Sequence, residues 1–395
     1  MTVALCPPPE PSGAPARHRA SSVGACLGVL LLLTACRGGV RGNDAAAGSA
    51  LVSAVAATPR APSAQSASAS PDGGPPLAPD GGAPSAPAPV RLGLVGDVNL
   101  ALSTGRLIHA MATGGTVPAG VEPGFPWGGV RQRLGEVELL VGNLECAVSL
   151  HGTPNAARPF AAPLESLPVL REIGFSVLSV ANNHSSDLGP IGFQETASNV
   201  AAAGLGVIGA RGGFGPEPQP ALVRTVRGLR IGFLGYPNVS LEKAEADVRR
   251  AKAGADVVVV LNHWGMEGCA EPTGFQRKLA HRMIDAGADL VVGTHAHIIQ
   301  PEERYHDKLI VYGLGDFVFA GNPGLPHYPG AYLEVDVDRS GVLARRFYRV
   351  RHDPNGAPSW IDEAASEPPR LGAEPAQPCS EPARLPPPAD SPPAR

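Results

Sequence analysis

The chain has 395 residues, and its 49 glycines and 43 prolines are about twice the average usage of these two residues. The hydrophobic fraction of 43% is close to that of ordinary globular proteins, so a core exists and the excess glycine and proline must lie outside it. The formal net charge is -4 and no run of Lys and Arg could follow a phosphate backbone, which argues against nucleic-acid binding.

The first 36 residues have the pattern of a lipoprotein signal peptide. Positive charges at Arg17 and Arg19 precede an apolar run at residues 23–33, which is too short to span a membrane but suits a signal sequence. The run ends in Leu-Thr-Ala-Cys, in which Cys36 would be acylated. We therefore predict an envelope protein held by a lipid at Cys36 on the periplasmic or extracytoplasmic face of a membrane. An uncleaved N-terminal anchor is the alternative.

Two segments, residues 37–89 and 355–395, have the composition of disordered chain. The first consists mostly of Ala, Pro, Ser and Gly without helical or strand periodicity, and the second is rich in proline. Such compositions bury too little apolar surface to offset the lost chain entropy. One folded domain is therefore predicted between them, at residues 90–354.

Three cysteines remain outside the signal peptide: Cys146, Cys269 and Cys379. The predicted compartment permits disulfides, and an odd number leaves at least one free thiol or an intermolecular bond. The spacings predict neither a pairing nor a zinc site. Cys146 could add a soft ligand beside Glu145, although its position favours a small core residue on the opposite face.

Within the predicted domain, short apolar runs rich in β-branched residues end at polar residues, often with glycine. Such runs are typical of strands buried on both faces, and the stretches between them have helical spacing. The predicted strands are residues 90–95, 137–141, 175–180, 256–261, 289–292 and 308–312. The clearest helix is predicted at residues 276–286, with an apolar stripe and a stop at Gly287. This alternation predicts a layered α/β fold.

Each predicted strand leads into residues that can bind metal. These are Asp97 and Asn99, then Glu145, then Asn183 with His184 and Asp187, then His263, then His295 with His297, and finally Asp316. Ligands gather outside the carboxyl ends of strands in layered α/β folds, so these loops should meet at one edge.

Taken singly, the same residues have ordinary structural interpretations. An aspartate such as Asp97 after a glycine often caps a turn, and a histidine such as His263 is more often packed in a core. For the pair His295 and His297 the two interpretations are evenly balanced. The repetition of ligand types at strand ends favours a single site.

The donor set suits two divalent ions. A carboxylate can bridge them, and imidazole and amide groups can complete each shell. Nitrogen and oxygen donors without thiolate favour Mn, Fe or Zn over Mg or Ca. Such ions make a water nucleophilic near neutral pH and neutralise charge on a phosphoryl oxygen.

These motifs resemble the CapA family of poly-γ-glutamate capsule synthesis proteins, whose domain is similar to calcineurin-like metallophosphatases. The resemblance covers about residues 92–319. It rests on Gly-Asp at 96–97, Asn-Leu-Glu at 143–145, Ala-Asn-Asn-His at 181–184, His-Trp-Gly at 263–265, Thr-His-Ala-His at 294–297 and Tyr-Gly-Leu-Gly-Asp-Phe at 312–317. It implies an α/β fold with a layered β-sandwich flanked by helices.

The resemblance also implies roles for the site residues. Asp97, Glu145 and His297 would hold one ion. The other ion would be held by Glu145, Asn183, His263 and His295, with Glu145 or Asp97 as the bridge. His184 would be the general acid for the leaving group, oriented by Asp187.

Several positions depart from the metallophosphatase pattern. Asn99 stands where many of these enzymes have a histidine, which weakens the first ion site. Thr294 and Ala296 replace the usual His and Pro beside the paired histidines. Gly313 and Asp316 replace the usual Ser and Asn, and Asp316 adds a carboxylate that could be a further ligand.

Two functions are compatible with this pattern. The first is a metal-dependent hydrolase acting on an anionic capsular polymer or a phosphoester in capsule synthesis, export or attachment. The alternative is a non-catalytic assembly module that binds polymer while capsule synthesis membrane proteins make it. A Walker-type loop is lacking, so ligation of glutamate by this chain is not expected.

Overall fold

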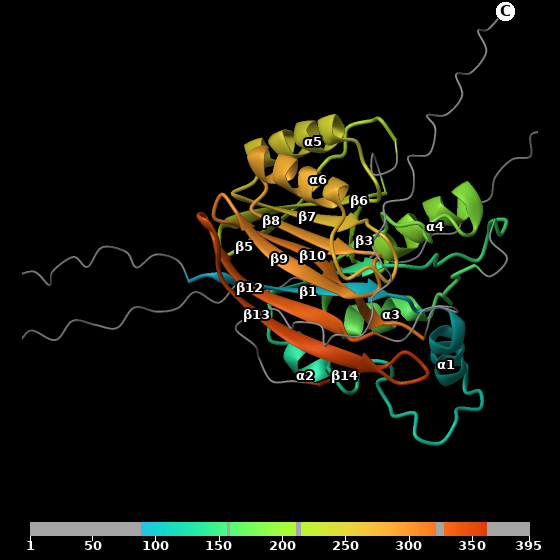
Figure 1. Ribbon diagram of the computed structural model, residues 1–395. Helices are drawn as coiled ribbons and strands as arrows, with labels where there is room; N and C mark the ends of the chain where they lie inside the picture. Colours follow the sequence, from blue (N-terminus) through green and yellow to red (C-terminus); the bar gives the residue numbers. More distant parts are fainter. Residues whose placement is uncertain (1–87, 156–158, 211–214, 321–327, 362–395) are drawn as a thin grey trace, which may run out of the picture. The chain divides into compact units, whose positions relative to one another are not determined.

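The computed structural model describes residues 88–155, 159–210, 215–320 and 328–361, which all fall in one compact unit, Asp80–Arg395. Two sheets form the framework of this unit (Figure 1). The predicted signal peptide, Cys36, nearly all of the tether, most of the tail and Cys379 lie outside the described residues.

The larger sheet contains β1 (Val90–Val98), β2 (Leu139–Leu144), β3 (Phe175–Ser179), β4 (Gly206–Ile208), β11 (Asp316–Val318), β12 (Gly330–Asp338), β13 (Gly341–His352) and β14 (Pro358–Trp360). The strands β1 to β4 are parallel neighbours. On the other side of β1, the strands β12, β13 and β14 follow in antiparallel order. The short strand β11 pairs in parallel with the end of β1.

The smaller sheet contains β5 (Leu222–Val226), β6 (Leu229–Tyr236), β7 (Val257–His263), β8 (Leu290–Thr294), β9 (Ile299–Tyr305) and β10 (Lys308–Leu314). Its inner strands β6, β7, β8 and β10 are parallel neighbours, and β5 and β9 close the two edges in antiparallel orientation. All six strands predicted from the sequence are present.

The alternation of side chains along each strand creates separate apolar layers. In β7, Val257, Val259 and Leu261 belong to the core between the two sheets. Val258 and Val260 point the other way and pack with helices. A parallel strand covered on both faces needs apolar residues at every position, which explains the continuous valine run.

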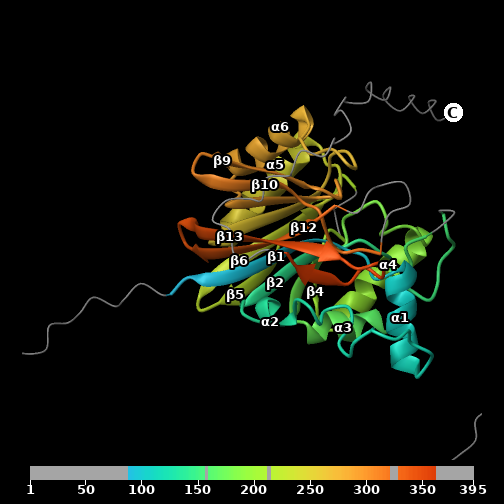
Figure 2. The ribbon, with the colours of Figure 1, turned by 60° about the horizontal axis from the view of Figure 1, so that its bottom comes forward.

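Helices cover the outer face of each sheet. The helices α5 (Leu241–Gly254) and α6 (Gly274–Asp285) pack on the smaller sheet. Figure 2 shows α1 (Leu102–Thr113), α2 (Arg131–Leu134), α3 (Ser166–Glu172) and α4 (Gly189–Ala202) on the side of the larger sheet, where their apolar residues join its outer core. The layers therefore run helix, sheet, sheet, helix, and the predicted layered α/β fold is confirmed.

Within the described ranges, no helix combines the length and the apolar character that crossing a bilayer requires.

Helix α6 corresponds to the helix predicted at residues 276–286, although it begins two residues earlier. The Thr273 side chain accepts a hydrogen bond from the Gln276 amide, and the Gln276 side chain accepts one from the Thr273 amide. This capping box satisfies two amides that a helix start leaves without partners. Leu279, Ala280 and Met283 then form the buried stripe.

The folded region extends beyond residue 354, where the predicted domain ended. The strand β14 pairs with β13, and Trp360 packs against the rings of Phe317, Tyr332 and Tyr348. The large apolar surface of Trp360 explains why these residues join the core although the sequence around them is polar and rich in proline.

Within the smaller sheet, Gly293 near the end of β8 lies close to the neighbouring strand β10 and to Trp264, which follows β7. A Cβ placed on Gly293 would lie 1.9 Å from the Tyr312 carbonyl oxygen and 2.3 Å from Trp264 Nε1. We expect Gly293→Ala to lower stability by about 1–3 kcal/mol, as overpacking does. Thermal unfolding should show this loss, whereas Gly254→Ala, where nothing lies within 4 Å of the added Cβ, should be neutral or slightly stabilising.

Candidate metal centre

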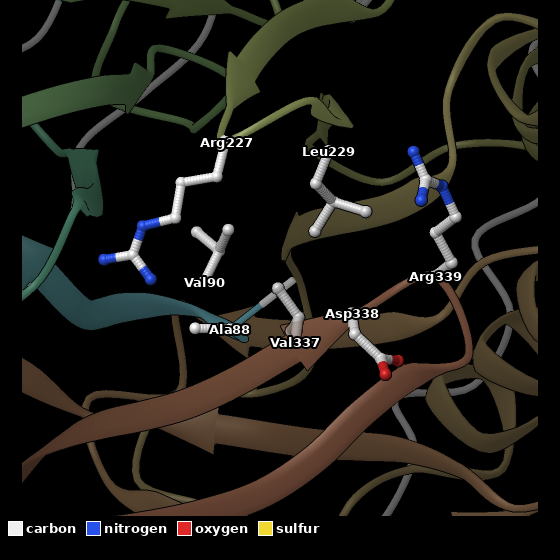
Figure 3. A pocket seen from close by; sticks show the side chains of 7 residues that line it. All are labelled: Ala88, Val90, Arg227, Leu229, Val337, Asp338 and Arg339. Atoms are coloured by element: carbon white, nitrogen blue, oxygen red, sulfur yellow. The ribbon is translucent and has the colours of Figure 1, made fainter. Parts of the chain in front are cut away.

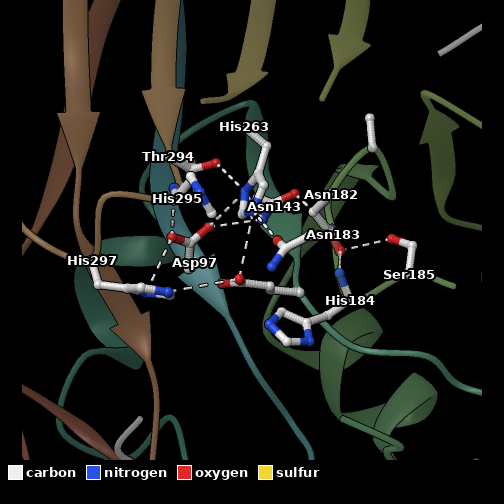
Figure 4. A network of polar contacts seen from close by, with 12 residues as sticks. Asp97, Asn143, Asn182, Asn183, His184, Ser185, His263, Thr294, His295 and His297 are labelled. Atoms are coloured by element: carbon white, nitrogen blue, oxygen red, sulfur yellow. Dashed lines mark hydrogen bonds and ion pairs between the residues drawn. The ribbon is translucent and has the colours of Figure 1, made fainter. Parts of the chain in front are cut away.

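Strand ends from both sheets meet at one cluster of polar side chains (Figure 4). Asp97 lies near the end of β1, and Glu145 follows β2 directly. From the other sheet, His263 is the last residue of β7, and His295 and His297 follow β8. The structure therefore brings the residues predicted from separate strand ends to one edge of both sheets, as expected for this class of fold.

One group of potential ligands consists of Glu145, His263 and His295, whose ligand atoms all lie within 4.8 Å of one another. Asn183 joins this group, because its Oδ1 is 2.6 Å from His263 Nε2. These are the residues expected to hold the second ion. One carboxylate, two imidazoles and an amide oxygen fit Mn, Fe or Zn.

A second group consists of Asp97, Glu145 and His297, again with ligand atoms within 4.8 Å of one another. Glu145 belongs to both groups, so it would contribute to holding both ions. Asn99 is placed differently from a ligand: its Oδ1 accepts a hydrogen bond from the Ala101 amide at 2.9 Å. The oxygen that a metal would need is thus engaged by the backbone, which gives this group three protein ligands.

Several ligand atoms have no hydrogen-bond partner among the described residues although they are buried. They are both carboxylate oxygens of Glu145, His295 Nδ1 and His297 Nε2. Leaving such atoms unpaired costs free energy, and a carboxylate costs most. Cations at the two groups would satisfy all four atoms, so the residues present fit a pair of divalent ions.

The turn after β8 aims the two histidines by an unusual backbone. His295 has φ 87° and His297 has φ 56°, so both adopt the left-handed conformation that few residues other than glycine adopt. Gly293 is not part of this turn, because it belongs to β8 and serves close packing. The left-handed histidines themselves place their rings 6.2 Å apart, and such strain is typical of functional sites.

Two residues that the sequence did not single out as site residues hold His263 in place. Thr294 Oγ1 lies 2.9 Å from His263 Nδ1, and Asn143 Nδ2 lies 3.2 Å from the same nitrogen. Asn143 also donates to Asp97 Oδ1 at 2.7 Å. Both side chains point between the sheets by the same alternation that buries Val141 and Val292 there. Counting positions in twos from the buried valines would have identified them.

The carboxylates of the cluster titrate unlike ordinary acids. Burial alone would raise the pKa of Asp97, but hydrogen bonding and attraction by His263, attraction by His297 and the His295 amide outweigh it and hold this pKa at about 2. Glu145 is also buried, and the neighbouring charge of Asp97 adds to the effect, so the pKa of Glu145 is raised well above its usual value. The pKa values of the two carboxylates therefore shift in opposite directions.

The pKa values of the three histidines also shift in different directions. Burial lowers the pKa of His263, and burial together with the nearby His263 lowers the pKa of His295 to about 3. Burial also acts on His297, but Asp316 and Glu145 outweigh it and raise its pKa well above the usual value. Their surroundings thus favour the neutral form of His263 and His295 and the protonated form of His297.

We expect metal uptake to release protons, because the raised pKa values of Glu145 and His297 favour their protonated forms and a ligand must be deprotonated to bind a cation. The dissociation constant should therefore fall as the pH rises above the ordinary pKa values of these two groups and increase as the pH drops. Calorimetric titration with Zn²⁺ in buffers of different ionisation enthalpy would measure the released protons. An affinity independent of pH would contradict this protonation scheme.

His184 lies beside the cluster (Figure 4). Asp187 and Phe160 hold its ring from two sides. Its Nδ1 is 2.9 Å from Asp187 Oδ2, which also accepts a hydrogen bond from the Phe160 amide at 2.8 Å. The Phe160 ring stacks on the imidazole with centroids 4.0 Å apart. Asp187 thus orients His184 as expected, and Phe160 is a further contact that the motif did not indicate.

The turn that carries His184 is fixed to the end of β2. Asn182 Nδ2 donates to Asn143 Oδ1 and to the Leu144 carbonyl oxygen, at 3.0 and 2.8 Å. Its Oδ1 accepts hydrogen bonds from the His184 amide and the Ser185 hydroxyl. Every polar atom of the buried Asn182 side chain is therefore used to position this turn, and Asn183 is left to face His263.

Neither of the cysteines that the structure describes, Cys146 and Cys269, belongs to a ligand group. Cys146 is a buried free thiol of the core, and burial raises its pKa to about 12. The prediction of a small core residue is therefore confirmed, and a thiol with such a pKa is inert. Cys269 is disulfide-bonded.

A small pocket elsewhere has a different character (Figure 3). It is lined by Val90, Leu229 and Val337 with the side chains of Arg227 and Arg339 at its sides. It lies where β1 and β6 begin, at the edge of the sheets opposite to the strand ends that carry the metal ligands. Its apolar lining offers nothing comparable to the ligand groups.

Comparison with known proteins identifies the family. The model of the bacterial capsule synthesis protein PGA_cap matches residues 91–321. The PGA biosynthesis protein CapA of Bacillus subtilis (strain 168) is 37% identical over 172 residues, which are 39% of this chain and 45% of that protein. The capsule biosynthesis protein CapA of Bacillus anthracis is 29% identical over 252 residues, which are 57% of this chain and 59% of that protein. The chain thus spans about half the length of the curated relatives it matches.

A solved structure with a similar arrangement is the putative 5'-nucleotidase from Staphylococcus aureus in complex with alpha-ketoglutarate. The similarity covers 71% of this chain and 55% of that one, with 14% sequence identity and a TM-score of 0.37, which is too low to support a conclusion about the site. The family model, in contrast, covers more than half of the sequence. The chain therefore belongs to the PGA_cap family of bacterial capsule synthesis proteins.

Proposed function

We propose that this protein is a metal-dependent hydrolase of capsule synthesis, acting on an anionic capsular polymer of the poly-γ-glutamate type or on a phosphoester. The observation that carries the proposal is the pair of ligand groups sharing Glu145, whose carboxylate oxygens are buried without a partner among the described residues. When bound, two divalent cations supply Lewis-acid activation of water and of the scissile bond.

The charges of the site favour an anionic substrate once the cations are present. Asp97, Glu145 and Asp316 are buried carboxylates, and their combined charge is smaller than that of two divalent ions. The loaded site would therefore carry a net positive charge in surroundings where electrostatic interactions are strong. Phosphoryl and carboxylate groups are the substrates that such a site attracts.

His184 supplies the proton-transfer group that hydrolysis needs. Its Nδ1 faces Asp187, so the proton available to a leaving group is the one on Nε2. The stacked Phe160 ring limits rotation of the imidazole. A histidine oriented in this way can protonate a departing alkoxide or amine.

The decisive experiment measures metal content and hydrolysis on the same purified full-length chain. It should bind two divalent ions and hydrolyse members of a panel of phosphoesters and γ-linked glutamyl peptides, with activity abolished by chelation and restored by Mn²⁺, Fe²⁺ or Zn²⁺. Bound metal without hydrolysis of any panel member, together with normal capsule display by a His184→Ala strain, would favour a polymer-binding assembly module instead.

Anchoring by lipid at Cys36 is part of the same proposal, because capsule is assembled outside the cytoplasm. The support is the sequence Leu-Thr-Ala-Cys at the end of a short apolar run. A Cys36→Ser variant should be released from membranes or remain unprocessed, as seen by fractionation and gel mobility. Wild-type behaviour of the variant in both measurements would rule out the lipoprotein assignment.

A further inference from the structure

Two of the candidate ligand histidines are supported by different chemical groups. The nearest group to His263 Nδ1 is the neutral hydroxyl Thr294 Oγ1 at 2.9 Å, and Asn143 Nδ2 and Asp97 Oδ1 lie farther off at 3.2 and 3.7 Å. His297 Nδ1 faces Asp316 Oδ1, a carboxylate, at 2.7 Å. Asp316 belongs to neither ligand group, although the sequence suggested it as a further ligand. It lies behind His297, on the ring edge opposite to the unpartnered Nε2.

The backbone of Asp316 is fixed by close contacts on two sides. In the parallel pairing of β11 with β1, Asp316 is in register with Asp97, and the Asp97 amide donates to the Gly315 carbonyl oxygen at 3.0 Å. A Cβ on Gly330 would lie 1.4 Å from the Asp316 carbonyl oxygen, so no larger residue fits there. Asp316 is therefore held in register with Asp97, the residue whose ligand group it supports.

We propose that Asp316 is the positioning residue of the site formed by Asp97, Glu145 and His297. By accepting the Nδ1 proton of His297, it fixes the tautomer in which the Nε2 lone pair faces Glu145. Its negative charge also makes that nitrogen a stronger donor. This inference rests on the proposed metal centre and explains how three protein ligands can hold an ion where Asn99 contributes none.

The hydrogen bond from His297 to Asp316 matters most for the group of Asp97, Glu145 and His297, because this group lacks a fourth side-chain ligand. The other group has Asn183 in addition to Glu145, His263 and His295, and the nearest side chain behind its His263 is Thr294. Loss of a carboxylate behind a ligand histidine commonly costs about 10–100-fold in metal affinity. We therefore expect the two sites to respond separately to changes at Asp316 and Thr294.

The test is a double-mutant cycle read out by Zn²⁺ affinity of the full-length chain. Asp316→Ala should weaken one of two binding steps by about 10–100-fold, and Asp316→Asn, which keeps the hydrogen-bond acceptor without the charge, should weaken it less. In a His297→Ala background, Asp316→Ala should have no further effect, whereas in a His263→Ala background its full effect should remain.

Thr294→Val serves as the matched control, because its effect should disappear in the His263→Ala background and persist with His297→Ala. Thermal unfolding without metal checks that each variant folds. If Asp316→Ala does not fold, the nearly isosteric Asp316→Asn provides the test. Unchanged Zn²⁺ affinity in Asp316→Asn and Asp316→Ala, or an equal loss with and without His297, would overturn the inference alone. A wild-type chain that binds no Zn²⁺ would overturn the metal centre itself.

Discussion

Replacing His263 with alanine is expected to remove one of the two bound ions and to abolish hydrolysis. His263 Nε2 lies 3.5 Å from Glu145 Oε1 and 2.6 Å from Asn183 Oδ1, so it is central to one ligand group. Removal of a ligand should cost at least the roughly 10–100-fold in affinity that changes behind a ligand cost. Metal analysis after dialysis should find one ion per chain instead of two.

A histidine outside the cluster provides the control. His281 lies on α6 and contacts Glu303 at 2.7 Å, with about a third of its side chain exposed. His281→Ala should keep both ions and full turnover, because Glu303 belongs to neither ligand group. If His263→Ala also retained two ions, the assignment of this group as a metal site would be wrong, whatever its effect on activity.

The strands could be predicted from the sequence because burial on both faces leaves a continuous apolar run. The valines of β7 are an example, since Val258 and Val259 serve different cores but are equally apolar. The hairpin of β12 and β13 is not apparent in the same way, because charged residues interrupt it. The buried Glu334 pairs with Arg346 at 2.6 Å, a partner twelve positions away that only folding supplies.

The site also has features that the local sequence predicts and features that only the folded structure reveals. Ligand types such as His263 and Glu145 could be predicted because they follow recognisable strands. The left-handed backbone of His295 and His297 could not, since nothing in their identity requires it. The place of Asp316 behind His297 also depends on pairing between β11 and β1, which are more than two hundred positions apart along the chain.

Replacing His184 with alanine is expected to leave both ions bound while lowering turnover by about 10²–10⁴, the usual contribution of general acid catalysis. His184 belongs to neither ligand group. Its Nδ1 is bonded to Asp187, so the imidazole acts from the rim of the cluster. Metal content equal to that of the wild type, measured together with the rate, separates this variant from His263→Ala.

The identity of the leaving group gives the sharper test of the role of His184. A nitrophenolate departs without a proton, so His184→Ala should slow hydrolysis of a nitrophenyl ester much less than hydrolysis of an alkyl ester of the same acid. Asp187→Asn should show the same dependence with a smaller loss, because Asp187 orients the His184 ring and does not itself donate the proton. An equal loss for both esters would mean that His184 binds or shapes the site and does not donate the proton, and normal turnover of both would favour a metal centre that binds polymer without cleaving it.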